Sequence, residues 1–156
     1  VFMSKSKELN LRNSIFIDNT ASDVIASKYE FYLKNSISVV TCNKIACADS
    51  YSNYQSLKDL AHQYSASFLF ETNVGAGLPI IDTLNNLVAS GDKIISIQAV
   101  LSGSLNYIFN NFKNENTFHE IVKNAMNDLY TEPDPIIYLS VIDFARIILL
   151  LARFCF

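Results

Sequence analysis

Short apolar runs alternate with longer stretches of helical apolar spacing over residues 1–74. The runs are rich in β-branched and aromatic residues and end in polar ones, which is typical of strands. The expected strands span residues 14–18, 37–41 and 66–70, and the expected helices span residues 21–35 and 51–64. Strands that alternate with helices predict βαβ units, and therefore an α/β fold with a parallel sheet.

From residue 75 onwards the pattern is mostly helical. Pro79 suits the first turn of a helix, where its missing N–H has no partner to lose, and Ser90-Gly91-Asp92 suits its end. Residues 93–101 alternate as a strand does. The other expected helices are 104–112, 117–129 and the apolar stretch 139–156. The change of pattern near Gly75 predicts two domains, residues 1–74 and residues 75–156.

The composition of the chain argues against two classes of partner, nucleic acids and membranes. The formal net charge is −3 and the basic residues are scattered, so nucleic acid is not an expected partner. The apolar stretch 139–156 contains Asp143, Arg146 and Arg153 and falls short of the ~20 apolar residues of a membrane span, so we expect a buried helix and no membrane. No secretory signal begins the chain.

The three cysteines, Cys42, Cys47 and Cys155, lack the spacing of metal ligands, and we expect reduced thiols in a cytoplasmic protein. The chain starts without Met and stops within an apolar helix pattern, so we expect a fragment of a longer protein.

Polar groups follow each of the three expected strands: Asn19-Thr20, Asn43-Lys44 and the segment from Glu71 to Gly77. Ligands of parallel α/β sheets bind beyond the carboxyl ends of the strands, so these groups predict a binding site, although loops are often simply polar. The turn with Gly75 and Gly77 could present N–H groups to an anion, present carbonyls to a cation beside Glu71, or only connect a strand to a helix.

Three more carboxylates are candidates. Glu132 and Asp134 lie in a segment stiffened by Pro133 and Pro135, and could bind an amino group or be solvated loop residues. Asp143 lies in an apolar helix pattern and needs a partner, which Arg146 could supply as a structural ion pair. The dinucleotide fingerprint G-x-G-x-x-G is absent, so a pyrophosphate loop would have to lie upstream of Val1.

Six segments taken together resemble homoserine dehydrogenase, especially the form fused behind an aspartate kinase. The resemblance runs from about Ser14 to Arg153. The segments are FIDNTAS at 16–22, SVVTCNK at 38–44, ETNVGAGLP at 71–79, LSGSLNYI at 101–108, YTEPDP at 130–135 and DFAR at 143–146.

The resemblance implies an oxidoreductase that interconverts L-homoserine and L-aspartate 4-semialdehyde with NADP or NAD, in threonine and methionine biosynthesis. It implies the C-terminal part of a Rossmann-like NAD(P)-binding domain, followed by part of an α/β substrate-binding and dimerisation domain. A homo-oligomer is therefore expected.

The resemblance also implies roles for single residues. Asn19, Thr20 and Lys44 would contact the cofactor, and Lys44 would act catalytically near the nicotinamide and the reacting oxygen. Glu132 and Asp143 would hold the substrate, Glu132 also reaching the cofactor and Asp143 also serving catalysis. A monovalent cation such as sodium would be held by the Glu71 side chain and by the carbonyls of Val74, Ala76 and Leu78.

The chain departs from the family pattern after Pro135, where Ile136-Ile137-Tyr138 replace acidic and basic residues, and at two single positions. Ile147 stands where the family has a catalytic lysine, and isoleucine cannot move a proton. Leu129 stands where the family has a glycine, three residues before Glu132. We expect this chain alone to be inactive, and a catalytically inactive remnant that keeps a folded dimerisation or binding module is the alternative function.

Overall fold

The computed structural model describes residues 5, 8, 13–113, 117–130 and 142–154. The chain forms two compact units, residues 1–86 and residues 87–156. Each unit has its own internal packing.

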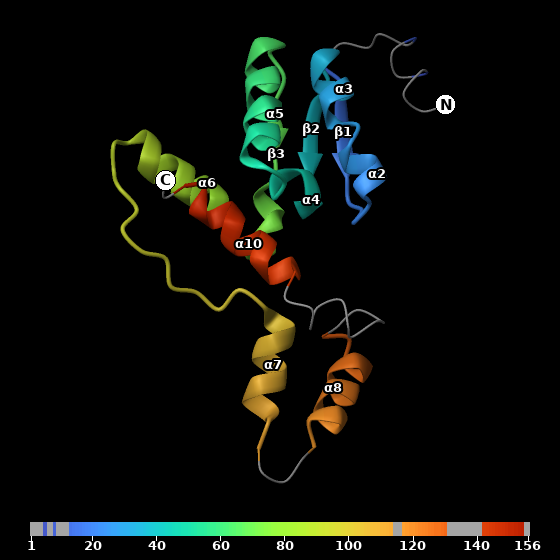
Figure 1. Cartoon of the computed structure of the whole chain (residues 1–156), viewed down its shortest axis with the longest axis vertical. Helices are drawn as coiled ribbons and strands as arrows, with labels where there is room; N and C mark the ends of the chain where they lie inside the picture. Colours follow the sequence, from blue (N-terminus) through green and yellow to red (C-terminus); the bar gives the residue numbers. More distant parts are fainter. Residues whose placement is uncertain (1–4, 6–7, 9–12, 114–116, 131–141, 155–156) are drawn as a thin grey trace. The chain divides into compact units, whose positions relative to one another are not determined.

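The first unit contains a three-stranded parallel sheet (Figure 1). Its strands are β1 (Ile15–Asp18), β2 (Ser38–Thr41) and β3 (Phe68–Leu69), paired in the order β1-β2-β3. Ile17 lies opposite Val40, and Val40 lies opposite Leu69. The predicted α/β fold with a parallel sheet is therefore confirmed, with strands one to three residues shorter than expected.

Helices connect these strands. They are α2 (Asp23–Ala26), α3 (Tyr29–Lys34), α4 (Lys44–Cys47) and α5 (Tyr51–Gln63). The single helix expected over residues 21–35 is thus two helices. The Ser22 side chain caps the first of them, and the Ser27 hydroxyl bonds the Val24 carbonyl at 2.9 Å where that helix ends. Side-chain bonds of this kind compete with helical backbone bonds, which explains the break.

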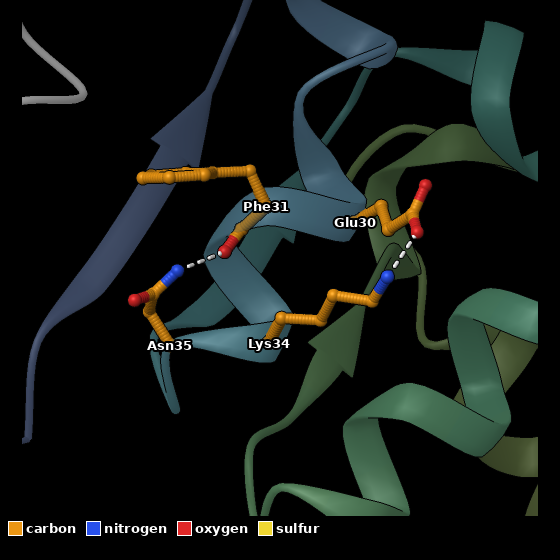
Figure 2. Close-up of polar contacts among 4 residues, drawn as sticks. All are labelled: Glu30, Phe31, Lys34 and Asn35. Atoms are coloured by element: carbon orange, nitrogen blue, oxygen red, sulfur yellow. Dashed lines mark hydrogen bonds and ion pairs between the residues drawn. The ribbon is translucent and has the colours of Figure 1, made fainter.

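Glu30 and Lys34 are exposed side chains on α3, and Figure 2 shows their contact. Lys34 forms an ion pair with Glu30 at 2.5 Å, and the Asn35 amide donates to the Phe31 carbonyl at 2.8 Å. An exposed pair of this kind contributes little to stability, because water and salt screen the two charges. The stability of α3 comes mainly from its other face, which buries Tyr29, Tyr32 and Leu33.

The two faces of the sheet differ. Phe16, Val39 and Phe68 lie in register on one face, where Phe16 stacks on Tyr32 with ring centroids 4.0 Å apart and Tyr29 meets Phe68 edge-on. On the other face the three side chains Ile15, Ile17 and Leu69 are 60%, 62% and 55% exposed. The helices therefore cover one face of the sheet, and the opposite face presents an open apolar surface.

After β3 come a short 3-10 turn, η1 (Glu71–Asn73), and α6 (Ile80–Ala89). Gly91, at φ +87°, ends α6 as expected: the N–H groups of Gly91 and Asp92 bond the carbonyls of Val88 and Leu87. The later helices are α7 (Gly103–Asn111), α8 (Phe118–Asn127) and α10 (Ile142–Ala152). None of the helices in the described part of the chain is long and apolar enough to cross a membrane.

The second unit has a small core between α7 and α8, which lie side by side in Figure 1. Ile108 packs there with Ile121, Val122 and Ala125. The strand expected at residues 93–101 is absent, and these residues have no regular structure. Ile95 is 96% exposed. A strand needs a neighbour to pair its backbone, and all three strands of the described residues belong to the first unit.

Candidate functional site

The three strand ends singled out in the sequence meet at one edge of the sheet. Because β1, β2 and β3 are parallel neighbours, the loops that follow them start side by side. Asn19 and Thr20 are exposed and Lys44 is partly exposed. The expected convergence of these loops is confirmed, and their polar side chains are accessible to a ligand.

Asp18, the last residue of β1, is buried immediately behind these exposed groups, at 2% exposure. Its Oδ1 accepts the Thr20 backbone N–H at 2.8 Å. Its Oδ2 accepts the Tyr29 hydroxyl at 2.5 Å and the Asn43 amide at 3.1 Å. One carboxylate thus holds the loop after β1 and contacts residues of α3 and of the loop after β2.

Thr41, the last residue of β2, also forms buried side-chain hydrogen bonds. Its hydroxyl lies 2.7 Å from the Tyr29 hydroxyl and accepts the Asn43 backbone N–H at 2.8 Å. Tyr29 gives its one hydroxyl proton to Asp18, and the Thr41 hydroxyl proton lies within reach of both the Tyr29 oxygen and the Asp18 backbone carbonyl, at 3.2 Å. The hydroxyls of Tyr29 and Thr41 therefore connect the end of β1 to the end of β2.

Asn43 joins the first two loops to each other. Its amide nitrogen donates to Asp18 and also to the Ser22 carbonyl, at 2.9 Å. Its side-chain oxygen accepts the Ile45 N–H at 3.1 Å, and so caps α4, of which Lys44 is the first residue. The start of α4 is in this way fixed relative to the loop that carries Thr20.

Asn73 connects the third strand end to the second. It is 1% exposed. With its amide nitrogen facing β2, it donates to the carbonyls of Cys42 at 2.9 Å and Thr41 at 3.1 Å. The Asn73 amide thereby supplies donors to two backbone carbonyls at the end of β2 and directly after it.

The electrostatics of Asp18 and Tyr29 agree with this geometry. Burial by itself would raise the pKa of Asp18, but the hydrogen bonds from Tyr29, Thr20 and Asn43 together lower that pKa below its usual value. Burial, and then the bond to Asp18, raise the pKa of Tyr29. Asp18 is therefore a buried anion at neutral pH, held by neutral donors.

The turn after η1 depends on a glycine. Gly75 has φ +73°, and a Cβ built on it would lie 2.7 Å from Cγ1 of Ile80. Ala76 follows with φ +51°. The Gly75 carbonyl accepts the Leu78 N–H at 3.0 Å. The backbone here turns tightly into α6, and only glycine fits the first of these positions without strain.

Glu71 has a structural role that was not predicted. Its Oε1 accepts the Ile81 N–H at 2.9 Å and its Oε2 accepts the Asp82 N–H at 2.8 Å. These donors belong to the first turn of α6 and have no partner within the helix. The carboxylate also complements the positive end of the helix dipole. The described residues contain no cluster of three or more His, Cys, Asp or Glu side chains that could hold a metal ion.

Replacing Glu71 with alanine is expected to destabilise the chain by about 1 kcal/mol, the usual effect of removing a helix cap. Urea unfolding followed by tyrosine fluorescence measures this, since the chain has 8 Tyr and no Trp. Thr72→Ala, at the exposed neighbouring position, is the control and should change stability by less than about 0.5 kcal/mol. Equal effects of the two changes would contradict the capping role.

The remaining predicted site residues belong to the second unit or lie outside the described residues. Asp143 is partly exposed near the start of α10, and Ile147, one turn later on the same helix face, is 7% exposed. Glu132 and Asp134 lie outside the described residues. Lys44 belongs to the first unit and Asp143 to the second.

The segment that leads toward Glu132 starts from a strained helix end. Leu129 follows α8 with φ +60° and is 88% exposed. The N–H groups of Leu129 and Tyr130 bond the carbonyls of Met126 and Ala125. Gly91 occupies the same position after α6. This geometry explains why a glycine is expected at position 129.

Leu129→Gly is expected to stabilise the chain by about 1 kcal/mol, because glycine adopts this conformation without a steric penalty and little apolar burial is lost. Thermal unfolding of the two proteins measures the gain. The reverse test is Gly91→Ala, which should lower stability by a similar amount. No gain at position 129 together with a loss at position 91 would refute the strain argument.

The family models match both parts of the chain. The model described as homoserine dehydrogenase, NAD binding domain, matches residues 2–71, and the model described as homoserine dehydrogenase matches residues 79–156. The second match begins at Pro79, directly before α6.

Two relatives of the chain belong to the family that these models describe. The chain is 45% identical over 141 residues to bifunctional aspartokinase/homoserine dehydrogenase 2, chloroplastic, of Arabidopsis thaliana, covering 90% of the chain and 15% of that protein. It is 43% identical over 145 residues to homoserine dehydrogenase of Schizosaccharomyces pombe, covering 90% of the chain and 39% of that protein. The chain therefore spans well under half of the length of either relative.

The structure is also similar to that of a hyperthermophilic archaeal homoserine dehydrogenase in complex with NADPH, with a TM-score of 0.84 and 29% identity over 99% of the chain and 46% of that protein. The parallel sheet with helices between its strands fits a Rossmann-like fold, and the NAD-binding model covers that sheet. With both of its parts matched by the models of one family, the chain belongs to the homoserine dehydrogenase family.

Proposed function

We propose that this chain supplies the nicotinamide end of a cofactor site, and part of a substrate site, for the interconversion of L-homoserine and L-aspartate 4-semialdehyde in threonine and methionine biosynthesis. One observation carries the proposal. Three strand ends of an NAD-binding domain meet at one sheet edge, with Asn19 and Thr20 exposed and Lys44 partly exposed.

The residues at this edge fit a nicotinamide cofactor, either NADP or NAD. Asn19 and Thr20 offer uncharged polar side chains, and Lys44 offers a positive charge at the start of α4. A bound nicotinamide would accept the hydride from the carbinol carbon. Lys44 would stabilise the negative charge that develops on the reacting oxygen while the hydroxyl proton passes to solvent water.

Asp143 is the substrate and catalytic carboxylate in this proposal, together with Glu132. A carboxylate that is partly exposed on a mostly apolar helix can bind the ammonium group of an amino acid. For Glu132, which we also propose as a cofactor-binding residue, the support is the family pattern of YTEPDP.

We also propose a monovalent cation, such as sodium, at the turn after η1, bound by Glu71 and by the carbonyls of Val74, Ala76 and Leu78. The support comes from the backbone of this turn and from the hydrogen bonds of Glu71. Positive φ at Gly75 and Ala76 turns the backbone sharply. Each Glu71 oxygen accepts one helix N–H and keeps a further lone pair for a ligand.

Three broader proposals accompany these. The boundary between the nucleotide-binding and substrate-binding domains lies at residues 74/75, between the two family matches. A homo-oligomer is supported by exposed apolar side chains such as Ile95 and Val100, which association would bury. A cytoplasmic location is supported by the free thiols of Cys42 and Cys47.

The deciding experiment is homoserine oxidation, followed as NADPH formation at 340 nm, in the protein expressed from the complete gene. Lys44→Ala should lower kcat by a factor on the order of 10² to 10³, as expected when a proton-transfer or charge-stabilising group is lost. Lys58→Ala, an exposed lysine on α5, is the control and should leave kcat unchanged.

The 156-residue chain alone is expected to show no turnover. If the complete protein binds NADPH but oxidises no homoserine, the alternative of an inactive binding module holds instead. Ile147, in place of the family lysine, would then account for the loss. Equal activity of Lys44→Ala and the unchanged protein would refute the role of Lys44.

A further inference from the structure

We propose that Asp18, Tyr29, Thr41 and Asn43 form a positioning unit, the strand-end network, that holds the loops of Thr20 and Lys44 in one fixed relation and thereby sets the affinity for the nicotinamide cofactor without touching it. The inference rests on the proposed function for the identity of the ligand. Its geometric part, the linkage of two loops, can be tested separately.

Burial separates the network from the surface that would bind a ligand. Its four side chains are 0–2% exposed, whereas Asn19 and Thr20 are exposed. A group buried to this degree cannot reach a cofactor lying on the sheet edge. Any effect of the network on binding must therefore pass through the backbone of the two loops.

The Asp18 carboxylate and the Asn43 amide each bind both loops. Asp18 holds the Thr20 N–H through Oδ1 and the Asn43 amide through Oδ2. The same Asn43 amide holds the Ser22 carbonyl, while its oxygen caps the helix that begins at Lys44. Displacing either loop alone would break a buried hydrogen bond of the other and leave a buried polar group without its partner.

Tyr29 holds the network together from outside both loops. It lies on α3, 0% exposed, and its ring packs against Phe16 and Phe68. Its hydroxyl contacts Asp18 at 2.5 Å and Thr41 at 2.7 Å, so it bridges the last residues of β1 and β2. Removing this single oxygen should loosen both loops while leaving their own residues unchanged.

The test compares Tyr29→Phe with Tyr32→Phe in the protein expressed from the complete gene. Tyr32 is a second buried tyrosine on α3, 3% exposed, which stacks on Phe16 and is not a member of the network. Hydrogen–deuterium exchange is measured for peptides covering residues 19–22 and 43–46, below the unfolding temperature of both variants. NADPH affinity is measured by fluorescence, and KM is measured for NADP and for homoserine.

We expect Tyr29→Phe to raise exchange at least 10-fold in both peptides, and to raise the Kd of NADPH and the KM of NADP about 10-fold. The KM of homoserine should stay within twofold, and Tyr32→Phe should match the unchanged protein. Asn43→Ser, which keeps a cap for α4 but loses the bonds to Asp18 and Ser22, should reproduce the effect. Thr41→Ser, which keeps the hydroxyl, should not.

Each of the other outcomes contradicts a defined part of this proposal. Faster exchange in only one peptide refutes the linkage of the loops. Faster exchange in both with unchanged Kd and KM shows a purely structural network and refutes the positioning role. If the unchanged protein binds no NADPH and has no activity, the proposed function fails, and with it the positioning role, while the exchange data still decide the linkage.

Discussion

We expect Asp18→Asn to lower the free energy of unfolding at pH 7 by about 2–3 kcal/mol. This is the typical contribution of hydrogen bonds to a buried charge. Asp18 accepts three such bonds and is 2% exposed. Asparagine has one accepting oxygen, and its amide group would face donors. At least one donor among Thr20, Tyr29 and Asn43 would then lose its partner.

The pH dependence follows from the lowered pKa of Asp18. Hydrogen bonds outweigh burial and place the pKa of Asp18 in the folded chain below its value in the unfolded chain, which is about 3.9. Around and below this value the unfolded state binds more protons than the folded state. The stabilisation is therefore complete above about pH 5 and is lost as the pH falls through the folded pKa.

Urea unfolding at pH 7 and at a series of pH values between 5 and 3 measures both effects. The difference between the chain and Asp18→Asn should shrink as the pH falls below about 4. Asp59→Asn, at an exposed position on α5, should change stability by less than about 0.5 kcal/mol at every pH. A difference for Asp18→Asn that is independent of pH would refute the buried anion.

Gly75→Ala is expected to destabilise the chain by about 2 kcal/mol, the sum of a left-handed backbone penalty and a steric contact. Gly75 has φ +73°, and the added Cβ would lie 2.7 Å from Cγ1 of Ile80. Ile80 is the first residue of α6 and has to shift. The change should also loosen the first turn of α6, where Glu71 binds.

Gly77→Ala is the matched control within the same turn. No atom lies within 4 Å of a Cβ built there, and its φ is not positive. Alanine should leave stability unchanged or raise it by up to about 1 kcal/mol, because it restricts the unfolded chain. Thermal unfolding of both variants measures the contrast, and equal loss at both positions would show that the turn is not constrained as described.

Much of the candidate site could be predicted, because the positions of its residues depend on where the strands end along the chain. Polar residues that directly follow the three strands had to meet at one edge once the strands were parallel. Pro79 was identified from local chemistry at a helix start, and it directly precedes α6 in the structure. The six segments carried the family resemblance, which the family models confirm.

The supporting residues could not be predicted in the same way. Tyr29 has the same helical spacing as other core residues, and nothing in the sequence shows that its hydroxyl meets Asp18, eleven positions earlier. Asp18 itself offered one signal, since a carboxylate that ends an apolar strand needs donors. The second carboxylate, Glu71, was predicted as a cation ligand, and its helix-capping bonds depend on a fold that brings α6 back toward it.

The sequence by itself determined the alternation of strands with helical segments up to β3, the parallel sheet and the family, because these depend on side-chain periodicity and on neighbours along the chain. Tertiary structure alone decided which groups support the loops and that residues 93–101 form no strand in the described chain. The physical reason is the same in both cases. A hydrogen bond or a strand pairing between distant segments exists only when packing brings both partners together, and that information is not local.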